Sequence, residues 1–407
     1  MLPKRVLIFS LTYAPYIGGA EIAIDEITRR ISPNDIHFDL ITLRADSNLP
    51  TIETRNNVTI HRIGPTKQGM TFENLASFPW YLIKVLYVPL AVLKARALAK
   101  GRPYDAYWCM MTNMVFPVSI LRTFFGDTTP YLITLQDGDT IEHILGRGRI
   151  RPFAFLLRKA FAEASAVQTI SRFLADLAKR IGYGGEPFVI PNGVSYEHFS
   201  DKKWKQDPER LVYRFDKKPN DVFLITTSRL VEKNAVDDIM RALPSLSARI
   251  NLLIVGTGPQ RDFLERLAAE LGVEKRVRFV GHVPYEQIPA YLATSDIFIR
   301  PSLSEGMGNS FIEAMAAGLP VIATPVGGIV DFLFDPDTDA GEKLPTGLFC
   351  RVRDPKSIAD SVTKFIENPA LVHKLVQNAG ALVRDVYEWD AIAERMRLEA
   401  FAKVFEE

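Results

Sequence analysis

Two glutamates, Glu305 and Glu313, are the residues of this chain whose types and spacing best suit chemistry. Residues 296–300 form a short apolar run with β-branched members, which predicts a buried strand, and residues 310–317 have the composition of a helix that Gly318 ends. Glu305 would lie in the loop between them and Glu313 inside the helix. Ligands of open α/β sheets bind beyond the carboxyl ends of the strands, so both carboxylates should point into one crevice.

The loop between the two glutamates is a candidate anion site. It would present several backbone N–H groups at a helix N-terminus, where unpaired donors and the helix dipole favour a phosphate. Carboxylates cannot bind that phosphate, but they accept hydrogen bonds from neutral hydroxyls. A ligand with phosphate between two sets of hydroxyls is a nucleotide sugar. The candidate donor-binding residues of the loop are Gly306, Met307, Gly308, Asn309 and Ser310.

Residues 305–321, together with Gly327 and Gly328, resemble the E-x7-E signature of the retaining glycosyltransferases of family 4, which have the GT-B fold. The resemblance implies that Glu305 is catalytic and holds donor-sugar hydroxyls near the reacting carbon, while Glu313 holds the ribose hydroxyls. It also implies that the new bond forms on the face from which the diphosphate leaves, with no bound metal and no cofactor. The resemblance spans nearly the whole chain and is most specific in its second half.

Two cations, Arg229 and Lys233, follow a predicted strand at 222–227. Fixed positive charge there would stabilise a departing nucleotide diphosphate, and the alternative is ordinary solvated surface charge. In the family the lysine usually stands five positions after the arginine and precedes a glycine, whereas here Asn234 and Ala235 occupy those places. Arg229 is therefore the stronger candidate, for both catalysis and donor binding, and Lys233 is a donor-binding candidate.

A glycine pair, Gly18 and Gly19, lies in the segment that joins the first predicted strand to the first helix. Glycines there permit positive φ and close approach of the backbone to a ligand, although a plain strand-to-helix turn also favours glycine. The pair is similar to the family's first-domain glycine loop, which faces the donor diphosphate and the acceptor. Gly18 and Gly19 are therefore predicted to bind the donor.

The segment 255–259 contains a partial dinucleotide fingerprint, but Arg261 stands where its third glycine would be, so the match is weak. Residues 281–284 resemble the family segment whose backbone lies along the nucleotide base. This resemblance makes His282 and Val283 base-side candidates, and the alternative for His282 is a polar residue at a strand end.

Residues 137–139 match the metal-binding pattern D-x-D of a different glycosyltransferase fold, but residues 335–339 match it too, so the pattern has little specificity. Relatives commonly carry a histidine that contacts the transferred sugar at the place of Gln136. The adjacent Asp137 is a catalytic candidate for a polar contact to sugar or acceptor, and the alternative is an aspartate that caps a loop.

The composition is that of an ordinary soluble globular protein, with 407 residues, 24% charged and 47% hydrophobic. A net charge of +1 argues against a nucleic-acid partner held by bulk positive charge. Cys109 and Cys350 have no metal-ligand or redox spacing, and the apolar run at the N-terminus is too short for a signal peptide. A cytoplasmic location is expected.

Strand patterns alternate with helix-length segments, which predicts βαβ units and two mostly parallel sheets. The first Rossmann-like domain, on the acceptor side, is expected at 1–200 and the donor-binding one at 221–385. A charged, proline-containing linker at 201–220 would separate them. In the family's GT-B fold the two domains face a central cleft, and the last helix, here 386–407, crosses back to the first domain.

Two basic segments with aromatic residues, 75–103 and 147–159, are candidates for binding an anionic membrane surface. Neither has the run of about 20 apolar residues that a spanning helix needs. The alternative is that their apolar faces complete the first domain's core while the lysines extend into solvent. Membrane contact would place the protein on the inner face of the cell membrane.

The resulting prediction is a metal-independent, retaining hexosyltransferase. It would move a hexose of the mannose, glucose or N-acetylglucosamine type from a UDP- or GDP-sugar to a hydroxyl of a glycan or lipid-linked acceptor. Two alternatives stay open. A nucleotide-sugar epimerase or hydrolase would need acid and base groups near the sugar, which Gln136 does not supply, and a non-catalytic nucleotide-sugar-binding protein would form no product.

Overall fold

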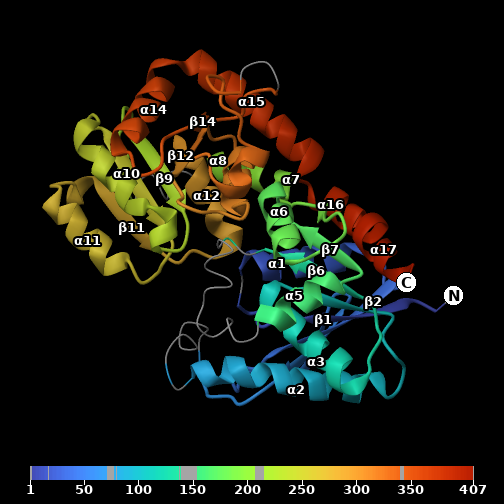
Figure 1. Ribbon diagram of the computed structural model, residues 1–407. Coiled ribbons are helices and arrows are strands. Elements are labelled where there is room, and N and C mark those ends of the chain that lie inside the picture. Colours follow the sequence, from blue (N-terminus) through green and yellow to red (C-terminus); the bar gives the residue numbers. More distant parts are fainter. Residues whose placement is uncertain are drawn as a thin grey trace. The chain divides into compact units, whose positions relative to one another are not determined.

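The computed structural model of the protein describes residues 2–16, 18–70, 78, 80–136, 138, 154–206, 215–339 and 343–406. The chain divides into two compact units. Unit 1 comprises Met1–Asn192 with Trp389–Glu407, and unit 2 comprises Gly193–Glu388. Both are α/β units built on a mainly parallel sheet (Figure 1).

Unit 1 contains an eight-stranded sheet among its described residues, in the order β3-β4-β2-β1-β5-β6-β7-β8. Neighbouring strands are parallel except for the antiparallel pair β3–β4. β1 lies in the core of unit 1, since Val6, Leu7, Ile8 and Phe9 are all fully buried. The strands are β1 (Lys4–Phe9), β2 (Ile36–Leu43), β3 (Ile52–Arg55), β4 (Val58–Ile63), β5 (Ala106–Met110), β6 (Tyr131–Leu135), β7 (Ala166–Thr169) and β8 (Phe188–Val189).

Helices cover both faces of the unit 1 sheet. On one face, α1 (Gly19–Arg30) shares a core with the C-terminal segment, in which α16 (Trp389–Arg395) continues through a π-helical turn (Met396–Phe401) into α17 (Ala402–Phe405). The ring of Phe401 lies 5.2 Å from that of Trp108 on β5. The other face is covered by α2 (Tyr81–Ala99), α3 (Val115–Phe125) and α5 (Ala154–Ala162), with α2 packed against α3 and α3 against α5. Next to α5 lies α6 (Arg172–Ile181).

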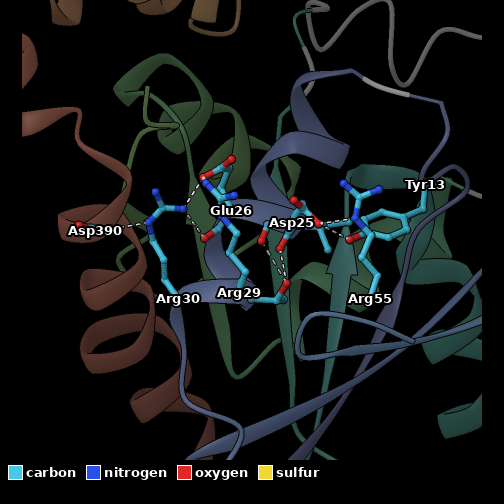
Figure 2. A network of polar contacts seen from close by, with 9 residues as sticks. Tyr13, Asp25, Glu26, Arg29, Arg30, Arg55 and Asp390 are labelled. Carbon is cyan, nitrogen blue, oxygen red and sulfur yellow. Dashed lines mark hydrogen bonds and ion pairs between the residues drawn. The ribbon is translucent and has the colours of Figure 1, made fainter. Parts of the chain in front are cut away.

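An ion pair and a hydrogen bond also join the C-terminal segment to the rest of unit 1. Arg30 at the end of α1 donates to the carboxylate of Asp390 on α16 at 2.5 Å, and Arg395 donates to the carbonyl of Val189 at 3.1 Å. The last helices are thus integral to unit 1 although they follow unit 2 in the sequence. Figure 2 shows this network along α1, which includes Tyr13, Asp25, Glu26, Arg29, Arg30, Arg55 and Asp390.

Unit 2 contains a six-stranded sheet among its described residues, in the order β11-β10-β9-β12-β13-β14, with every neighbouring pair parallel. The strands are β9 (Val222–Thr227), β10 (Ile250–Val255), β11 (Val277–Gly281), β12 (Ile297–Arg300), β13 (Val321–Ala323) and β14 (Leu348–Phe349). β9 and β12 lie at the centre, so the ends of these two strands form the middle of the carboxyl edge.

The helices of unit 2 pack on both sides of this sheet. The core on one side joins residues of α10, α11 and α14, and on the other side α13 packs against α15 and α7. The helices are α7 (Tyr196–Ser200), α8 (Lys203–Gln206), α10 (Val236–Ala242), α11 (Arg261–Glu270), α12 (Ile288–Ala293), α13 (Asn309–Ala316), α14 (Pro355–Glu367) and α15 (Pro369–Val386). Short 3₁₀ segments lie at Thr112–Met114, Glu232–Asn234, Leu243–Ser245, Glu274–Arg276, Tyr285–Gln287 and Gly327–Asp331.

The sequence predicted the α/β class correctly, and its predicted strands 222–227 and 296–300 match β9 and β12 to within one residue. It did not predict three strands: β3 has exposed polar residues, β4 includes the polar His61 and Arg62, and β14 is only two residues long. Within the predicted linker 201–220, residues 207–214 lie outside the described part. No helix of the described residues is long and apolar enough to cross a membrane.

Candidate functional site

Buried polar atoms without a hydrogen-bond partner mark the carboxyl edge of the unit 2 sheet. Six such side-chain atoms occur in the described part of unit 2, and all belong to residues at or just beyond the ends of β9, β10 and β12. Leaving a buried polar group unpaired costs about 1–3 kcal/mol, and these unpaired groups cluster at the edge where open α/β sheets bind their ligands. They are the hydroxyls of Thr226, Thr227, Ser228 and Ser302, Nε of Arg300, and Oε1 of Gln260.

Glu305 lies in the loop that leaves β12 at this edge, as the sequence predicted. Its side chain is 14% exposed, and both carboxylate oxygens have a partner within unit 2. Oε2 accepts a hydrogen bond from Nη2 of Arg300 at 2.5 Å, and Oε1 accepts one from the backbone N–H of Gly306 at 3.0 Å. Each carboxylate oxygen has two lone pairs, so both can also accept a ligand hydroxyl.

The loop from Gly306 to Ser310 leads directly into α13. Gly308 is the N-cap residue of that helix, with φ +88°, and it has no side chain that could cap the first N–H groups. Phe311 on the first turn packs edge-to-face on Phe298 of β12, with ring centroids 5.4 Å apart. This packing aims the N-terminus of α13, with its uncapped dipole, at the carboxyl edge of the sheet.

Glu313 lies inside α13 and is buried, with 9% of its surface exposed. Burial raises the pKa of Glu313 to about 7, and the nearby positive charge of Arg300 opposes that rise only in part. Burial likewise lowers the pKa of Arg300, while the charges of Glu305 and Glu313 raise it. One buried cation thus interacts with both glutamates of the predicted pair.

The sequence interpretation did not single out Arg300. Its side chain contacts Glu305, donates from Nη1 to the hydroxyl of Ser310 at 2.7 Å, and lies over the ring of Phe311. The only signal in the sequence is a charged residue that closes an otherwise apolar strand. Such a residue is more often exposed, so its burial between the two glutamates required the structure.

Arg229 and Lys233 lie on the loop after β9, next to the Glu305 loop. The backbone N–H of Leu303 donates to the carbonyl of Lys233 at 2.7 Å, which joins the two loops directly. The side chain of Arg229 is exposed. Asn234, at the place of the family's lysine, is buried and donates from its side chain to the carbonyl of Arg229 at 2.7 Å. Asn234 therefore supports the loop that carries the two cations.

The glycines of the partial dinucleotide fingerprint have a packing role. A Cβ on Gly256 would lie 1.9 Å from the carbonyl oxygen of Ser228, and a Cβ on Gly258 would lie 2.4 Å from that of Leu230. The N–H of Leu230 also donates to the carbonyl of Thr257 at 2.9 Å. Glycine is required because the two loops touch backbone to backbone, and this contact helps to place Arg229.

His282 and Val283 follow β11, which is the edge strand of the unit 2 sheet. His282 is exposed and Val283 is buried. Two strands, β10 and β9, separate β11 from β12 and the Glu305 loop. The structure thus places these two residues at the far end of the same sheet, beside the loop that begins with Gly256. The N–H of Gly256 donates to the carbonyl of Gly281 at 2.8 Å.

Gly18 and Gly19 belong to unit 1, where they begin α1. Gly18 has φ −135°, an extended conformation open to any residue, so its backbone does not use the positive φ that glycine permits. A close approach does exist: a Cβ on Gly18 would lie 2.8 Å from Oε2 of Glu21. The other oxygen of Glu21 accepts a hydrogen bond from Thr12, so this carboxylate packs into the loop.

Gln136 also belongs to unit 1, and its amide is engaged. It donates to Oδ1 of Asn192 at 3.1 Å and accepts from Nδ2 of Asn192 at 3.0 Å. An amide in such a reciprocal pair is fixed in position and is no base. The neighbouring candidate Asp137 lies outside the described residues. In the second D-x-D match, Asp335 is buried and accepts from the N–H groups of Asp337 and Phe349, which is a turn-forming role.

The chain matches two family models. One, described as "Glycosyl transferases group 1", matches residues 209–381, and the other, described as "Glycosyl transferase 4-like domain", matches residues 18–193. Together they span most of both units.

Three known proteins illustrate the similarity. An uncharacterized glycosyltransferase of Methanocaldococcus jannaschii is 26% identical, with 96% of each chain covered. A GDP-mannose-dependent alpha-(1-6)-phosphatidylinositol monomannoside mannosyltransferase of Mycobacterium tuberculosis is 32% identical over 56% of this chain and 58% of its own. The crystal structure of the Anabaena protein HepE in complex with UDP-glucose superposes with a TM-score of 0.77 at 20% identity, covering 98% of this chain and 99% of the other. The last similarity shows a shared fold.

Proposed function

This chain belongs to the group 1 glycosyltransferases and has the GT-B fold, and we propose that it is a retaining hexosyltransferase that uses a nucleoside-diphosphate sugar. The hexose would be of the mannose, glucose or N-acetylglucosamine type, and the acceptor a hydroxyl of a glycan or lipid-linked molecule. The observation that carries the proposal is the pair Glu305 and Glu313 around the buried Arg300 at the carboxyl edge of the unit 2 sheet.

Each part of a nucleotide sugar has a matching group at this edge. We assign the ribose hydroxyls to Glu313 and the donor-sugar hydroxyls to Glu305, because carboxylates accept hydrogen bonds from hydroxyls. The diphosphate would lie at the uncapped N-terminus of α13, where the backbone N–H groups from Gly306 to Ser310 favour an anion. The nucleotide base would extend toward His282 and Val283 near β10 and β11.

Arg229, with Lys233 beside it, supplies positive charge for the leaving diphosphate. Among the described residues Arg229 forms no ion pair, so its charge is not already neutralised. Fixed cations and helix-terminal N–H groups stabilise charge that develops on a leaving group, and they can serve where other enzymes use a metal. Metal-independent transfer is the corresponding proposal, and it predicts that a chelator leaves turnover unchanged.

The groups proposed to act are compatible with retention of the anomeric configuration, which the resemblance to the retaining family implies. In the reaction the bond from the anomeric carbon to the diphosphate oxygen breaks, and a bond to the acceptor oxygen forms on the same face. The acceptor hydroxyl must lose its proton, and the paired amide of Gln136 cannot take it. The departing diphosphate oxygen, which gains negative charge as its bond breaks, is the base available on that face. Gly18, Gly19 and Asp137 remain candidates for contacts to the diphosphate or acceptor.

The donor is tested by incubating the purified protein with a panel of UDP-, GDP- and ADP-sugars, with and without membrane lipid extract. The printed names of two similar proteins, one dependent on GDP-mannose and one bound to UDP-glucose, make these the first donors to try. Glycosylated product with the donor's anomeric configuration is the expected result. Tight donor binding with neither transfer nor donor breakdown, across a broad acceptor panel, would favour a non-catalytic binding protein. Interconversion or hydrolysis of the donor alone would favour an epimerase or hydrolase.

A lipid-linked acceptor is supported by the outer face of α2. Four apolar residues at helical spacing, Leu82, Val85, Leu86 and Leu93, are between 45% and 61% exposed. Two further exposed rings, Phe124 and Phe125, lie at the end of the neighbouring α3. The opposite face of α2, with Ile83, Tyr87 and Val92, is buried, so the alternative that segment 75–103 completes the core holds for that face and not for the outer one.

Basic residues continue the same face. Arg96 lies over the ring of Phe125, with 3.9 Å from the guanidinium carbon to the ring centroid, and Lys100 lines an open hollow of about 300 Å³ with it. Exposed apolar side chains beside cations suit the interface of an anionic membrane. We therefore propose a cytoplasmic protein that binds the inner face of the cell membrane. In the second candidate segment, residues 147–153 lie outside the described part, and Phe155 is 65% exposed.

Vesicle sedimentation tests this membrane surface. The protein is expected to sediment with vesicles of phosphatidylcholine and phosphatidylglycerol but not with phosphatidylcholine alone. Leu86→Glu with Leu93→Glu should abolish sedimentation, whereas Leu398→Glu, at an exposed apolar residue of the C-terminal segment, should not. Equal sedimentation of wild type and the α2 variant would exclude this face.

A further inference from the structure

Arg300 is a buried cation that joins three parts of the proposed donor site. It closes β12 with its side chain only 7% exposed. One arm of the guanidinium, Nη2, donates to Glu305, and the other arm, Nη1, donates to the hydroxyl of Ser310 in the first turn of α13. The planar group also lies over the ring of Phe311, 4.3 Å from its centroid. A single side chain therefore spans the loop from its first acidic residue to the start of the helix.

The loop is shaped to admit this guanidinium. A Cβ on Gly308 would lie 2.5 Å from Nη2 of Arg300, and Gly308 has φ +88°, which favours glycine. Any side chain at position 308 would therefore displace the arm that holds Glu305. Glycine at this position leaves room for the arginine and also for the ring of Phe311, whose Cδ2 would lie 2.6 Å from the same Cβ.

Only arginine can make both contacts. Its fork of N–H donors is planar and rigid, so the positions of Glu305 and Ser310 are fixed relative to each other as well as to β12. Lysine would keep the charge but present one ammonium group on a flexible stem. Because Oε2 of Glu305 is bonded to Arg300 and Oε1 to the N–H of Gly306, the carboxylate has one orientation, and its remaining lone pairs have defined directions.

We propose that Arg300 is a positioning residue: it locks the carboxylate of Glu305 and the first turn of α13 in one geometry, so that the sugar and diphosphate ends of the donor are aligned. The inference rests on the proposed function for its consequence in catalysis. Its structural part, that Arg300 orders the loop, does not depend on any ligand. A misplaced catalytic group lowers the rate of the chemical step more than it lowers binding.

The variant Arg300→Lys tests the fork with the charge retained. Arg351→Lys is the matched control, since Arg351 is an exposed arginine that pairs with Asp354 within three residues and lies outside the site. Hydrogen exchange of peptides covering 301–312, measured without ligand, should be at least fivefold faster in Arg300→Lys and unchanged in the control. Equal exchange in both variants would overturn the inference, whatever the protein's substrate.

Steady-state kinetics with the donor identified from the UDP-, GDP- and ADP-sugar panel give the second readout. For Arg300→Lys, kcat should fall by about 10- to 100-fold while the KM for the donor changes less than threefold. A merely structural role predicts a lower thermal midpoint with unchanged kcat per folded molecule, and that result would also overturn the inference. Should the wild type transfer no sugar at all, the proposed function fails, and the hydrogen-exchange comparison still decides the role of Arg300.

Gly308→Ala is a second way to move the guanidinium, and its new methyl group would also meet the ring of Phe311. It retains Arg300, Glu305 and Ser310 but moves the guanidinium, so it should show the same fast exchange and the same loss of kcat. Ser310→Ala removes one arm's partner only and should give an intermediate loss. Full activity in Gly308→Ala would show that the position of the guanidinium is unimportant.

Discussion

The backbone N–H of Gly328 donates a hydrogen bond to the carbonyl oxygen of Glu305 across 3.0 Å. The preceding Gly327 has φ +56°, and a Cβ there would lie 1.9 Å from the same carbonyl oxygen. The turn after β13 thus touches the backbone of the proposed catalytic glutamate. Its side chain is held by Arg300 and its main chain by this glycine turn, so two separate segments define where Glu305 lies.

Gly327→Ala should therefore impair the site directly. The new methyl group would collide with the carbonyl of Glu305, and a left-handed alanine is itself strained by about 1–2 kcal/mol. We expect turnover to fall by more than tenfold and the thermal midpoint to drop. Gly272→Ala is the control, because Gly272 has φ +66° and no atom lies within 4 Å of the position that its new methyl group would take. The control should lose stability with normal turnover, and equal losses of turnover in both variants would contradict the assignment.

Glu313 should make unit 2 less stable as the pH rises. Its folded-state pKa of about 7 is above the ordinary value of 4.5, so the protonated form is the one that folding favours. The favourable contribution is complete below about pH 4.5 and is lost as the pH rises through 7, with an upper limit of about 3 kcal/mol. Thermal midpoints of wild type and Glu313→Gln, measured from pH 5 to 8, should separate progressively, with the variant relatively more stable at pH 8. Parallel curves would contradict the raised pKa.

The same residue should determine nucleotide affinity. If Glu313 holds the ribose hydroxyls, Glu313→Ala should weaken binding of UDP or GDP by about 10- to 100-fold at pH 8, where the carboxylate is charged, because a hydrogen bond to a charged group contributes roughly 1.5–3 kcal/mol. Calorimetric titration measures this, with Glu270→Ala on the exposed end of α11 as control. Unchanged affinity in Glu313→Ala would reject the ribose assignment.

Asn234→Ala should loosen the cation loop without removing a cation. The buried amide of Asn234 donates to the carbonyl of Arg229, and its loss would leave that carbonyl without this partner, at a cost of about 1–3 kcal/mol. Donor affinity should fall about tenfold, and less than in Arg229→Leu. A double variant with both Asn234→Ala and Arg229→Leu should lose no more donor affinity than Arg229→Leu alone. Fully additive losses in titrations of the three variants would show that Asn234 acts elsewhere.

Asp39 should govern the acid stability of unit 1. Burial disfavours its charged form, but hydrogen bonds from His61, Arg5 and Tyr104 outweigh burial and hold the pKa of Asp39 at about 2. A lowered folded-state pKa adds stability above the ordinary value of 3.8, and this stability, about 2 kcal/mol, is lost as the pH falls toward 2. Asp39→Asn should be less stable than wild type at pH 5, with a smaller difference at pH 2.5. Thermal denaturation at the two pH values distinguishes this from a pH-independent loss.

Local patterns predicted the parts of this protein that depend on neighbours in sequence. The apolar runs at β9, β10 and β12 could be assigned because buried parallel strands are apolar throughout. The same locality placed Glu305 in a loop and Glu313 in a helix. Ala235, at the place where the family pattern has glycine, adopts φ +48°, a conformation that favours glycine.

The sequence by itself thus determined the α/β class, the order of the main strands and the position of both glutamates on consecutive elements. Only the tertiary structure decided how those glutamates are held, because their partners come from separate segments that packing brings together. The burial of Arg300 against Glu305, the contact of Gly328 with Glu305, and the pairing of Gln136 with Asn192 have no local signature. The raised pKa of Glu313 is likewise a consequence of burial, which depends on every element packed around α13.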